Sequence, residues 1–267
     1  MNPSLGALAA IVTAFLWAFS SIAFTFASIR AGAMAVNRLR LLMAVALLML
    51  AHALFRLPLP LAVGQERWLL LGASGFVGLV LGDGFLFQAF VWIGPRLTML
   101  LLSTAPALAT LWAWWFLGEA LSAMEVTGVL VTILGVGWVI QARDGTAGRP
   151  GDARRYALGV LCGLGGAAGQ AGGLILAEQG MAGDFPALSA TLMRMVVAAI
   201  TLWLYTAVRG QIGETVARFA KDHRAAWLSL AGSFLGPFVG VTLSLLSIQH
   251  VAIGIASTLM ALTPVFL

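Results

Sequence analysis

Charged side chains are scarce in this sequence. They make up 9% of the 267 residues, while 61% of the residues are hydrophobic. A water-soluble domain keeps about a quarter of its residues charged, so most of this chain must face lipid or other apolar helices. The composition predicts an all-α, multi-pass integral membrane protein.

Other absences exclude several classes of protein. The single cysteine, Cys162, excludes an intrachain disulfide and a multi-cysteine metal site. Neither HExxH nor GxxxxGK(S/T) occurs, which excludes a zinc protease of that type and the direct use of ATP. We therefore expect no metal and no cofactor.

The net charge of +5 does not indicate nucleic acid as a partner. The basic residues are spread over loops and helix ends, and they form neither a basic face nor a groove-binding motif. Anionic lipid headgroups account for them better, since arginine beside a membrane span binds such headgroups.

Apolar runs between charges, prolines and glycines predict nine membrane spans, each about 20 residues long. The first run, from Leu5 to Ile29, has no preceding Lys or Arg and is too long for a signal peptide. The predicted spans are 5–29, 35–55, 67–92, 95–116, 123–141, 156–180, 186–208, 224–248 and 251–267.

The stretch rich in glycine and charge after the fifth span predicts a boundary between two halves. We expect a first half of five spans at 1–141, a linker at 142–155 and a second half at 156–267. A second polar connection, Arg209–Lys221, has the composition of a short interfacial helix.

The two halves repeat each other. Small residues and a proline recur at an offset of 158 residues, and an arginine recurs at an offset of 154. The matched pairs are Ser74 and Gly232, Gly78 and Gly236, Gly82 and Gly240, Pro106 and Pro264, and Arg40 and Arg194. Small residues at every fourth position allow helices to approach closely in lipid.

The repeat also predicts a difference between the halves. Leu267 corresponds to Ala109, so the second half has no counterpart of residues 111–140. We expect a tenth helix to be missing from this chain, with an exposed apolar surface beside the ninth.

The stretch Leu100–Ile140 resembles the EamA-like family of the drug/metabolite transporter (DMT) superfamily. It contains a proline-centred helix, a Gly-Glu pair at its end, and a following helix with spaced glycines. The arginines of the second and seventh spans and the Trp of the first span extend the resemblance over the chain. The motif residues are Pro106, Gly118, Glu119, Gly128, Gly135, Arg40, Arg194 and Trp17.

This resemblance implies ten helices in two inverted five-helix repeats around a central cavity. It also implies export or exchange of small metabolites or drugs. Because each repeat has an odd number of helices, the second repeat must enter the membrane from the opposite side. Substrate sites in such folds lie near the midplane, between the repeats.

Asp83 is the one carboxylate deep in a predicted span, where an isolated charge is costly. Substrate or proton binding and a hydrogen bond to a neighbouring helix explain it equally well. Gln170, amid small residues, is a candidate for the cavity wall, with a contact to another helix as the alternative. Trp17 is a candidate for stacking on a substrate, and a place in the apolar core explains it equally well. Glu178 lies two turns beyond Gln170, where a solvated interfacial acid is the better explanation.

Other candidates also have structural explanations. Arg40 and Arg194 are expected to snorkel to headgroups, with pairing to a carboxylate or an anionic substrate as the alternative. Glu119 fits helix capping better than a direct transport role. Pro106 and Pro264 each remove a hydrogen bond inside a helix, which marks either a tolerated kink or the binding region.

The sequence thus predicts a secondary transporter for small organic solutes, with a proton or another ion as possible coupling partner. Membrane lipid is the second partner, and a monomer or homodimer is expected, in the inner membrane if the source is bacterial. A lipid or lipid-linked sugar flippase is the alternative. An intramembrane enzyme is disfavoured, because an aspartyl protease needs two membrane Asp residues.

Two arguments on orientation disagree. Odd-numbered connections between spans carry most of the basic residues, while even-numbered ones carry only Arg56 and Arg67. Since Lys and Arg favour the cytoplasmic side, this asymmetry predicts an external N-terminus. The family resemblance implies a cytoplasmic one.

Overall fold

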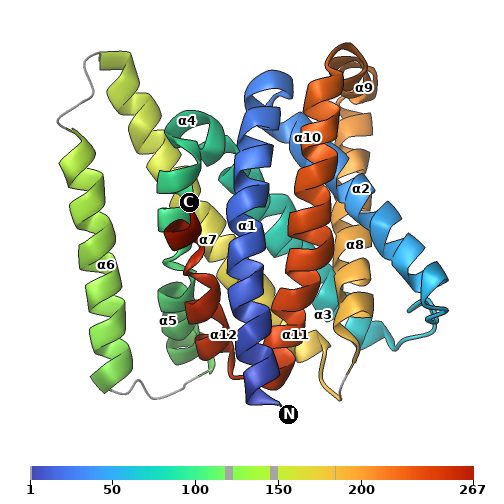
Figure 1. Cartoon of the computed structure of the whole chain (residues 1–267), viewed down its shortest axis with the longest axis horizontal. Coiled ribbons are helices and arrows are strands. Elements are labelled where there is room, and N and C mark those ends of the chain that lie inside the picture. The colour runs from blue at the N-terminus through green and yellow to red at the C-terminus, as the bar shows by residue number, and fades with distance from the viewer. Residues whose placement is uncertain (1, 118–122, 145–149, 184) are drawn as a thin grey trace.

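The computed structural model describes residues 2–117, 123–144, 150–183 and 185–267, and every regular element in these ranges is helical (Figure 1). The elements are α1 (Pro3–Ala31), α2 (Ala33–Leu54), α3 (Gln65–Gly75), the π-helix η1 (Phe76–Gly82), α4 (Asp83–Leu102), α5 (Ala105–Leu117), α6 (Ala123–Asp144), α7 (Pro150–Gly180), α8 (Ala187–Val208), α9 (Ile212–Lys221), α10 (His223–Ser233), the π-helix η2 (Phe234–Gly240), α11 (Val241–His250), α12 (Ile253–Met260) and the 3-10 helix η3 (Thr263–Phe266).

Within the described ranges, six helical segments are long and apolar enough to cross a membrane. They correspond to the first, second, third, sixth, seventh and eighth predicted spans. The fifth span lies in α6, whose apolar stretch is Val126–Trp138. The fourth and ninth spans are helical but broken in the middle, so the prediction of nine continuous helices is wrong at these two places.

The two breaks have the same form. α4 ends at Leu102, and after two intervening residues α5 begins with Pro106 in its first turn. α12 ends at Met260, and after two intervening residues η3 begins with Pro264 in its first turn. Proline is favoured in the first turn of a helix, where its missing N–H would have no partner. We had expected each proline to lie inside a continuous helix and to remove a hydrogen bond there. Each proline lies instead in the first turn of a new helix.

The third and eighth spans share a second irregularity. Each contains a seven-residue π-helix, η1 or η2, between two α-helical segments. The π-helices start at Phe76 and Phe234 and are offset by the same 158 residues as the matched glycines. π-Helical turns are rare and concentrate at functional sites.

The glycines of η1 allow a backbone-to-backbone contact with α7. A Cβ added to Gly169 would lie 2.4 Å from the Cα of Gly82, and one added to Gly173 would lie 3.0 Å from the Cα of Gly78. In the other half, η2 packs against α1: a Cβ on Gly240 would lie 2.8 Å from Nε1 of Trp17. The first long helix of each half thus packs on the π-helix of the other half.

Corresponding helices run in opposite directions in Figure 1. α1 rises from the N-terminus while α7 descends, and the α3–η1–α4 segment rises while α10–η2–α11 descends. α6 stands at one side of the bundle and packs against α5.

Helical structure extends into both ends of the linker expected at 142–155, since α6 continues to Asp144 and α7 begins at Pro150. Proline at the first position of a helix fixes a suitable φ in advance, which explains the early start of α7.

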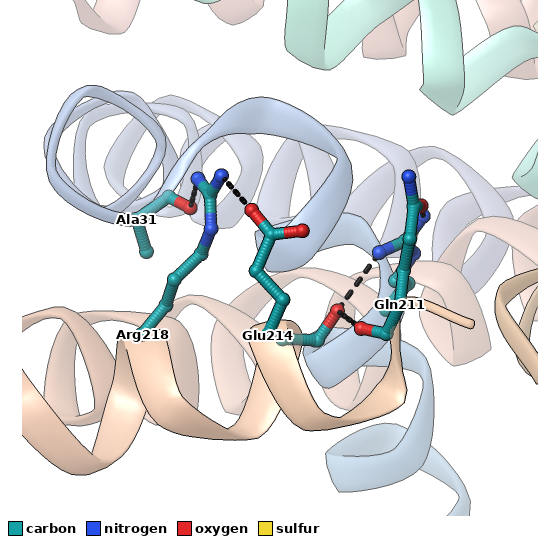
Figure 2. Close-up of polar contacts among 6 residues, drawn as sticks. Ala31, Gln211, Glu214 and Arg218 are labelled. Carbon is teal, nitrogen blue, oxygen red and sulfur yellow. Dashed lines mark hydrogen bonds and ion pairs between the residues drawn. The ribbon is translucent and has the colours of Figure 1, made fainter. Parts of the chain in front are cut away.

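The helix expected near Arg209–Lys221 is α9, and it ties the second half to the end of α1 and to α2 (Figure 2). Arg218 donates to the carbonyl of Ala31 and pairs with Glu214 at 2.6 Å. Arg38 of α2 donates to the side chains of Thr215 and Gln211, at 2.8 and 2.7 Å. Together, these hydrogen bonds hold α9 against the end of the bundle where α1 is followed by α2.

Candidate functional site

A cavity lies between the two halves, with about 490 Å³ of space that is partly open to the surroundings. Aromatic and aliphatic side chains make up most of its wall, and a few polar groups from α1, α2, α4 and α7 converge on it. Its lining includes Trp17, Ser20, Ser21, Phe24, Arg40, Asp83, Phe87, Phe90, Gln170, Pro237 and Val241. A mostly apolar wall with a few placed polar groups is typical of small-molecule sites.

Arg40 and Asp83 form an ion pair in the wall of this cavity. The guanidinium donates Nη2–H to Oδ2 of Asp83 and Nε–H to Oδ1 of Asn37, at 2.8 Å for the second bond. Arg40 is 3% exposed and Asp83 8%. The guanidinium also lies 4.9 Å from the ring centroid of Phe87, where a cation is attracted to the aromatic face.

The expectation that Arg40 and Arg194 snorkel to lipid headgroups is therefore wrong. Arg40 follows the alternative, pairing with a carboxylate, and Arg194 is 1% exposed on the inner side of α8. The cause is tertiary packing: a Cβ on Gly75 would lie 2.3 Å from the carbonyl oxygen of Arg194. With α8 pressed onto α3, the side chain of Arg194 runs inward along η1, beside Gly78.

Arg194 has no carboxylate of its own among the described residues. Its electrostatic partner is Asp83, which also interacts with Arg40. Its buried Nε makes no hydrogen bond in the described part of the chain. The single carboxylate of Asp83 thus interacts with two buried guanidinium groups.

Trp17 and Gln170 lie on opposite sides of the interface between the halves, and both line the cavity with Asp83. Trp17 packs against Gly240, and Gly169, the residue before Gln170, packs against Gly82. Because Gly82 and Gly240 are matched positions of the repeat, Trp17 and Gly169 make corresponding contacts in the two halves, and Gln170 follows Gly169 directly. The cavity wall thus receives an indole from one half and an amide from the other.

A second cavity, with about 340 Å³ of partly open space, shares Trp17 and Gln170 with the first. Its wall contains both helix breaks, through Ser103 and Pro106 of one half and Ala261 and Thr263 of the other. The two cavities together follow the interface between the halves, and Trp17 and Gln170 stand where they meet.

The remaining predicted residues lie away from these cavities or outside the described ranges. Glu178 is exposed near the end of α7 and is absent from both linings. Gly128 and Gly135 lie on α6, and a Cβ added to either would meet no atom within 4 Å. Gly118 and Glu119 fall outside the residues that the structure describes.

His52, near the end of α2, is also absent from the cavity linings. It is buried, its Nδ1 donates to the carbonyl of Leu48 in its own helix, and its Nε2 accepts from Ser189 of α8 at 3.1 Å. Neither residue of this pair lines either cavity. The geometry is that of a hydrogen bond holding two helices together.

Comparison with known families decides what kind of protein carries this cavity. The EamA-like transporter family matches residues 4–141 and 157–267, which is nearly the whole chain.

The chain belongs to the EamA-like transporter family.

Members of this family are membrane transporters of the DMT type, not enzymes, and the apolar helices of this EamA-like protein make it an integral, multi-pass membrane protein. A solved structure, described only as a crystal structure of a protein, aligns with it at a TM-score of 0.65 and 18% sequence identity. The alignment covers 100% of this chain and 86% of the other, and it supports the fold. No curated protein matches the sequence.

Sequence reasoning about this EamA-like protein missed the partner of Arg40 and the position of Arg38. Arg40 and Asp83 are 43 residues apart, and no local pattern joins them. One signal was present in the sequence: the first half has a single carboxylate deep in a span and arginines in its second span, and such charges are each costly in a membrane unless they pair.

Proposed function

We propose that this protein is a secondary transporter that carries small organic solutes through the cavity between its halves. The observation behind this proposal is the Arg40–Asp83 pair, which lies at the cavity wall between an indole and an amide from opposite halves. A buried ion pair is weak evidence for stability. Charged residues that lie within a membrane and face a cavity are, by contrast, typical of the pathways of substrates and ions.

The two halves are proposed to be inverted repeats. Three matched features support this relation: the π-helices, the helix breaks before Pro106 and Pro264, and the crossed packing of α1 on η2 and of α7 on η1. The opposite directions of corresponding helices in Figure 1 agree with inversion. In such transporters one repeat rocks against the other around a central site.

Within this mechanism, Asp83 is the group that changes its partner during transport. The carboxylate of Asp83 holds Arg40, and a proton that reaches the cavity competes with Arg40 for the same oxygen. Coupling to an ion gradient then follows, because the pair cannot hold Arg40 and the incoming group equally well. Efflux is the direction that we propose, across the inner membrane if the source is bacterial.

Two measurements test this function. The purified protein is screened against a metabolite library by thermal shift, and the hits are followed by counterflow into proteoliposomes. Asp83→Asn keeps the side-chain volume and one hydrogen-bond acceptor, and we expect it to fold while counterflow is abolished or loses its dependence on the proton gradient. Glu178→Gln, outside both cavities, is the matched control. Normal coupled counterflow by Asp83→Asn contradicts the proposed role.

A further inference from the structure

The central charges of this protein do not cancel. Among the described residues of the membrane helices near the cavity, Arg40 and Arg194 are the buried cations and Asp83 is the buried carboxylate. Arg40 holds the carboxylate by a direct hydrogen bond, and Arg194 interacts with it only electrostatically. One positive charge is left in surplus.

The repeat shows where this surplus comes from. At the offset of 158 residues that matches the glycines and prolines, Asp83 corresponds to Val241. Arg40 and Arg194 are matched residues of the two halves, and the second half has an apolar side chain at the position where the first half has the acid that pairs with Arg40. Val241 is buried and lines the same cavity as Asp83. The two halves therefore differ in charge at matched positions of the cavity wall, an acid at Asp83 and an apolar side chain at Val241.

The cavity has no free acid to receive a cationic solute. The one carboxylate in its wall is engaged by Arg40, and an amine would have to displace that guanidinium. A carboxylate-bearing solute meets the opposite situation. Arg194 is absent from the lining of the cavity, but its surplus positive charge lies behind the wall at η1, beside Gly78. In the weakly screened interior this charge attracts an anion in the cavity and repels a cation. Trp17, Phe24 and Phe87 supply the apolar wall for the rest of the molecule.

We infer that the solute is an organic monoanion, an apolar or aromatic body carrying one carboxylate, and that Arg194 and Val241 together set this preference. This inference rests on the proposed transport function for its physiological meaning, but binding tests it separately. Electrostatic complementarity of this kind selects between ligands of the same shape.

The experiment uses three sets of probes that share a body and differ in the head group. They are hexanoate, hexylamine and hexanol; phenylacetate, phenethylamine and 2-phenylethanol; and indole-3-acetate, tryptamine and tryptophol. Apparent affinities are measured for the full chain in detergent from the shift in thermal unfolding. In at least one set we expect the carboxylate to bind about tenfold more tightly than the amine and the alcohol.

Two variants should remove this preference by opposite routes. Arg194→Met deletes the surplus cation, and replacing an unpaired buried charge by an apolar side chain of similar length favours folding. Val241→Asp supplies the missing carboxylate. Arg194→Lys and Val241→Asn are the matched controls, which keep the charge balance of the wild type and should keep its preference.

Three results overturn the inference: amines that bind as well as the carboxylates, carboxylates that bind in none of the sets, or a preference that survives in both Arg194→Met and Val241→Asp. Counterflow separates this question from the proposed function. Amines that bind and are carried across leave transport standing and refute the anion preference. Carboxylates that bind but do not cross support the preference and refute transport.

Discussion

Replacing Gly169 by alanine should destabilise the protein, although the same replacement usually stabilises a helix. The added Cβ would lie 2.4 Å from the Cα of Gly82, 2.9 Å from its nitrogen and 3.0 Å from the carbonyl oxygen of Val77. All three neighbours are backbone atoms of the α3–η1–α4 segment, so no side chain can rotate away. To restore an ordinary contact, α7 and η1 must separate by about 1 Å, which is an overpacking strain.

The magnitude follows from two opposing terms. Overpacking of a tight contact costs up to about 3 kcal/mol, while Gly→Ala within a helix gains about 1 kcal/mol. The net loss is about 2 kcal/mol, which for a chain of this size lowers the midpoint of thermal unfolding by roughly 4–8 °C.

The control is the same substitution at Gly135 on α6, where a Cβ meets nothing within 4 Å. There only the helix-propensity gain of up to about 1 kcal/mol applies, so the midpoint should stay constant or rise. The assay is thermal unfolding of both purified variants in one detergent. If Gly169→Ala unfolds at the same temperature as Gly135→Ala or above it, the backbone contact between the halves does not exist as described.

Two further predictions concern the ends of the bundle. The pKa of Glu214 is lowered by its hydrogen bond from Arg218, and the pKa of Asp222 by the backbone N–H of Ala225 and then by Arg30. Glu214 stabilises α9 and Asp222 caps α10; this stabilisation is complete above about pH 4.5 and is lost as the pH falls through the lowered values. Hydrogen exchange at residues 212–221 should accordingly accelerate at pH 3 relative to pH 6, after correction for the intrinsic rate, and equal protection at both would contradict this. A cysteine placed at Ser4, with Cys162 replaced, should react with an impermeant thiol reagent in intact cells, as an external N-terminus requires; reaction only after lysis would support the cytoplasmic alternative.

Local sequence features predicted much of this fold because their physical causes are local. Apolar runs gave the positions of the spans, and the glycines matched at an offset of 158 residues lie where η1 and η2 contact α7 and α1. Pro106 and Pro264 mark real interruptions, but their role was misjudged. A proline is compatible with both a kink and a helix start, and the choice depends on where the preceding helix ends.

The charged site was predicted less well, since burial of an arginine is a tertiary property. Arg40 lies close enough to the end of its span to reach headgroups, and only the position of Asp83 on another helix draws it inward. Arg194 is buried for a different reason, the close approach of α8 to Gly75. Neither partner is visible in a single helical segment, although both arginines stood out as intramembrane charges.

The π-helix η1 makes the number of residues before Asp83 a determinant of the direction in which Asp83 points. A π-turn uses i→i+5 hydrogen bonds, so η1 holds more residues than an α-helix would over the same number of turns. Removing one residue, such as Leu79, would allow ordinary α-helical bonding and would rotate everything beyond it by about 100° about the helix axis.

Asp83, the first residue of α4, would then leave Arg40, with little change in composition or hydrophobicity. Insertions and deletions inside residues 76–82 or 234–240 should consequently be far less tolerated than substitutions of one aliphatic side chain by another. The spacing between the glycines and the acid is itself part of the site.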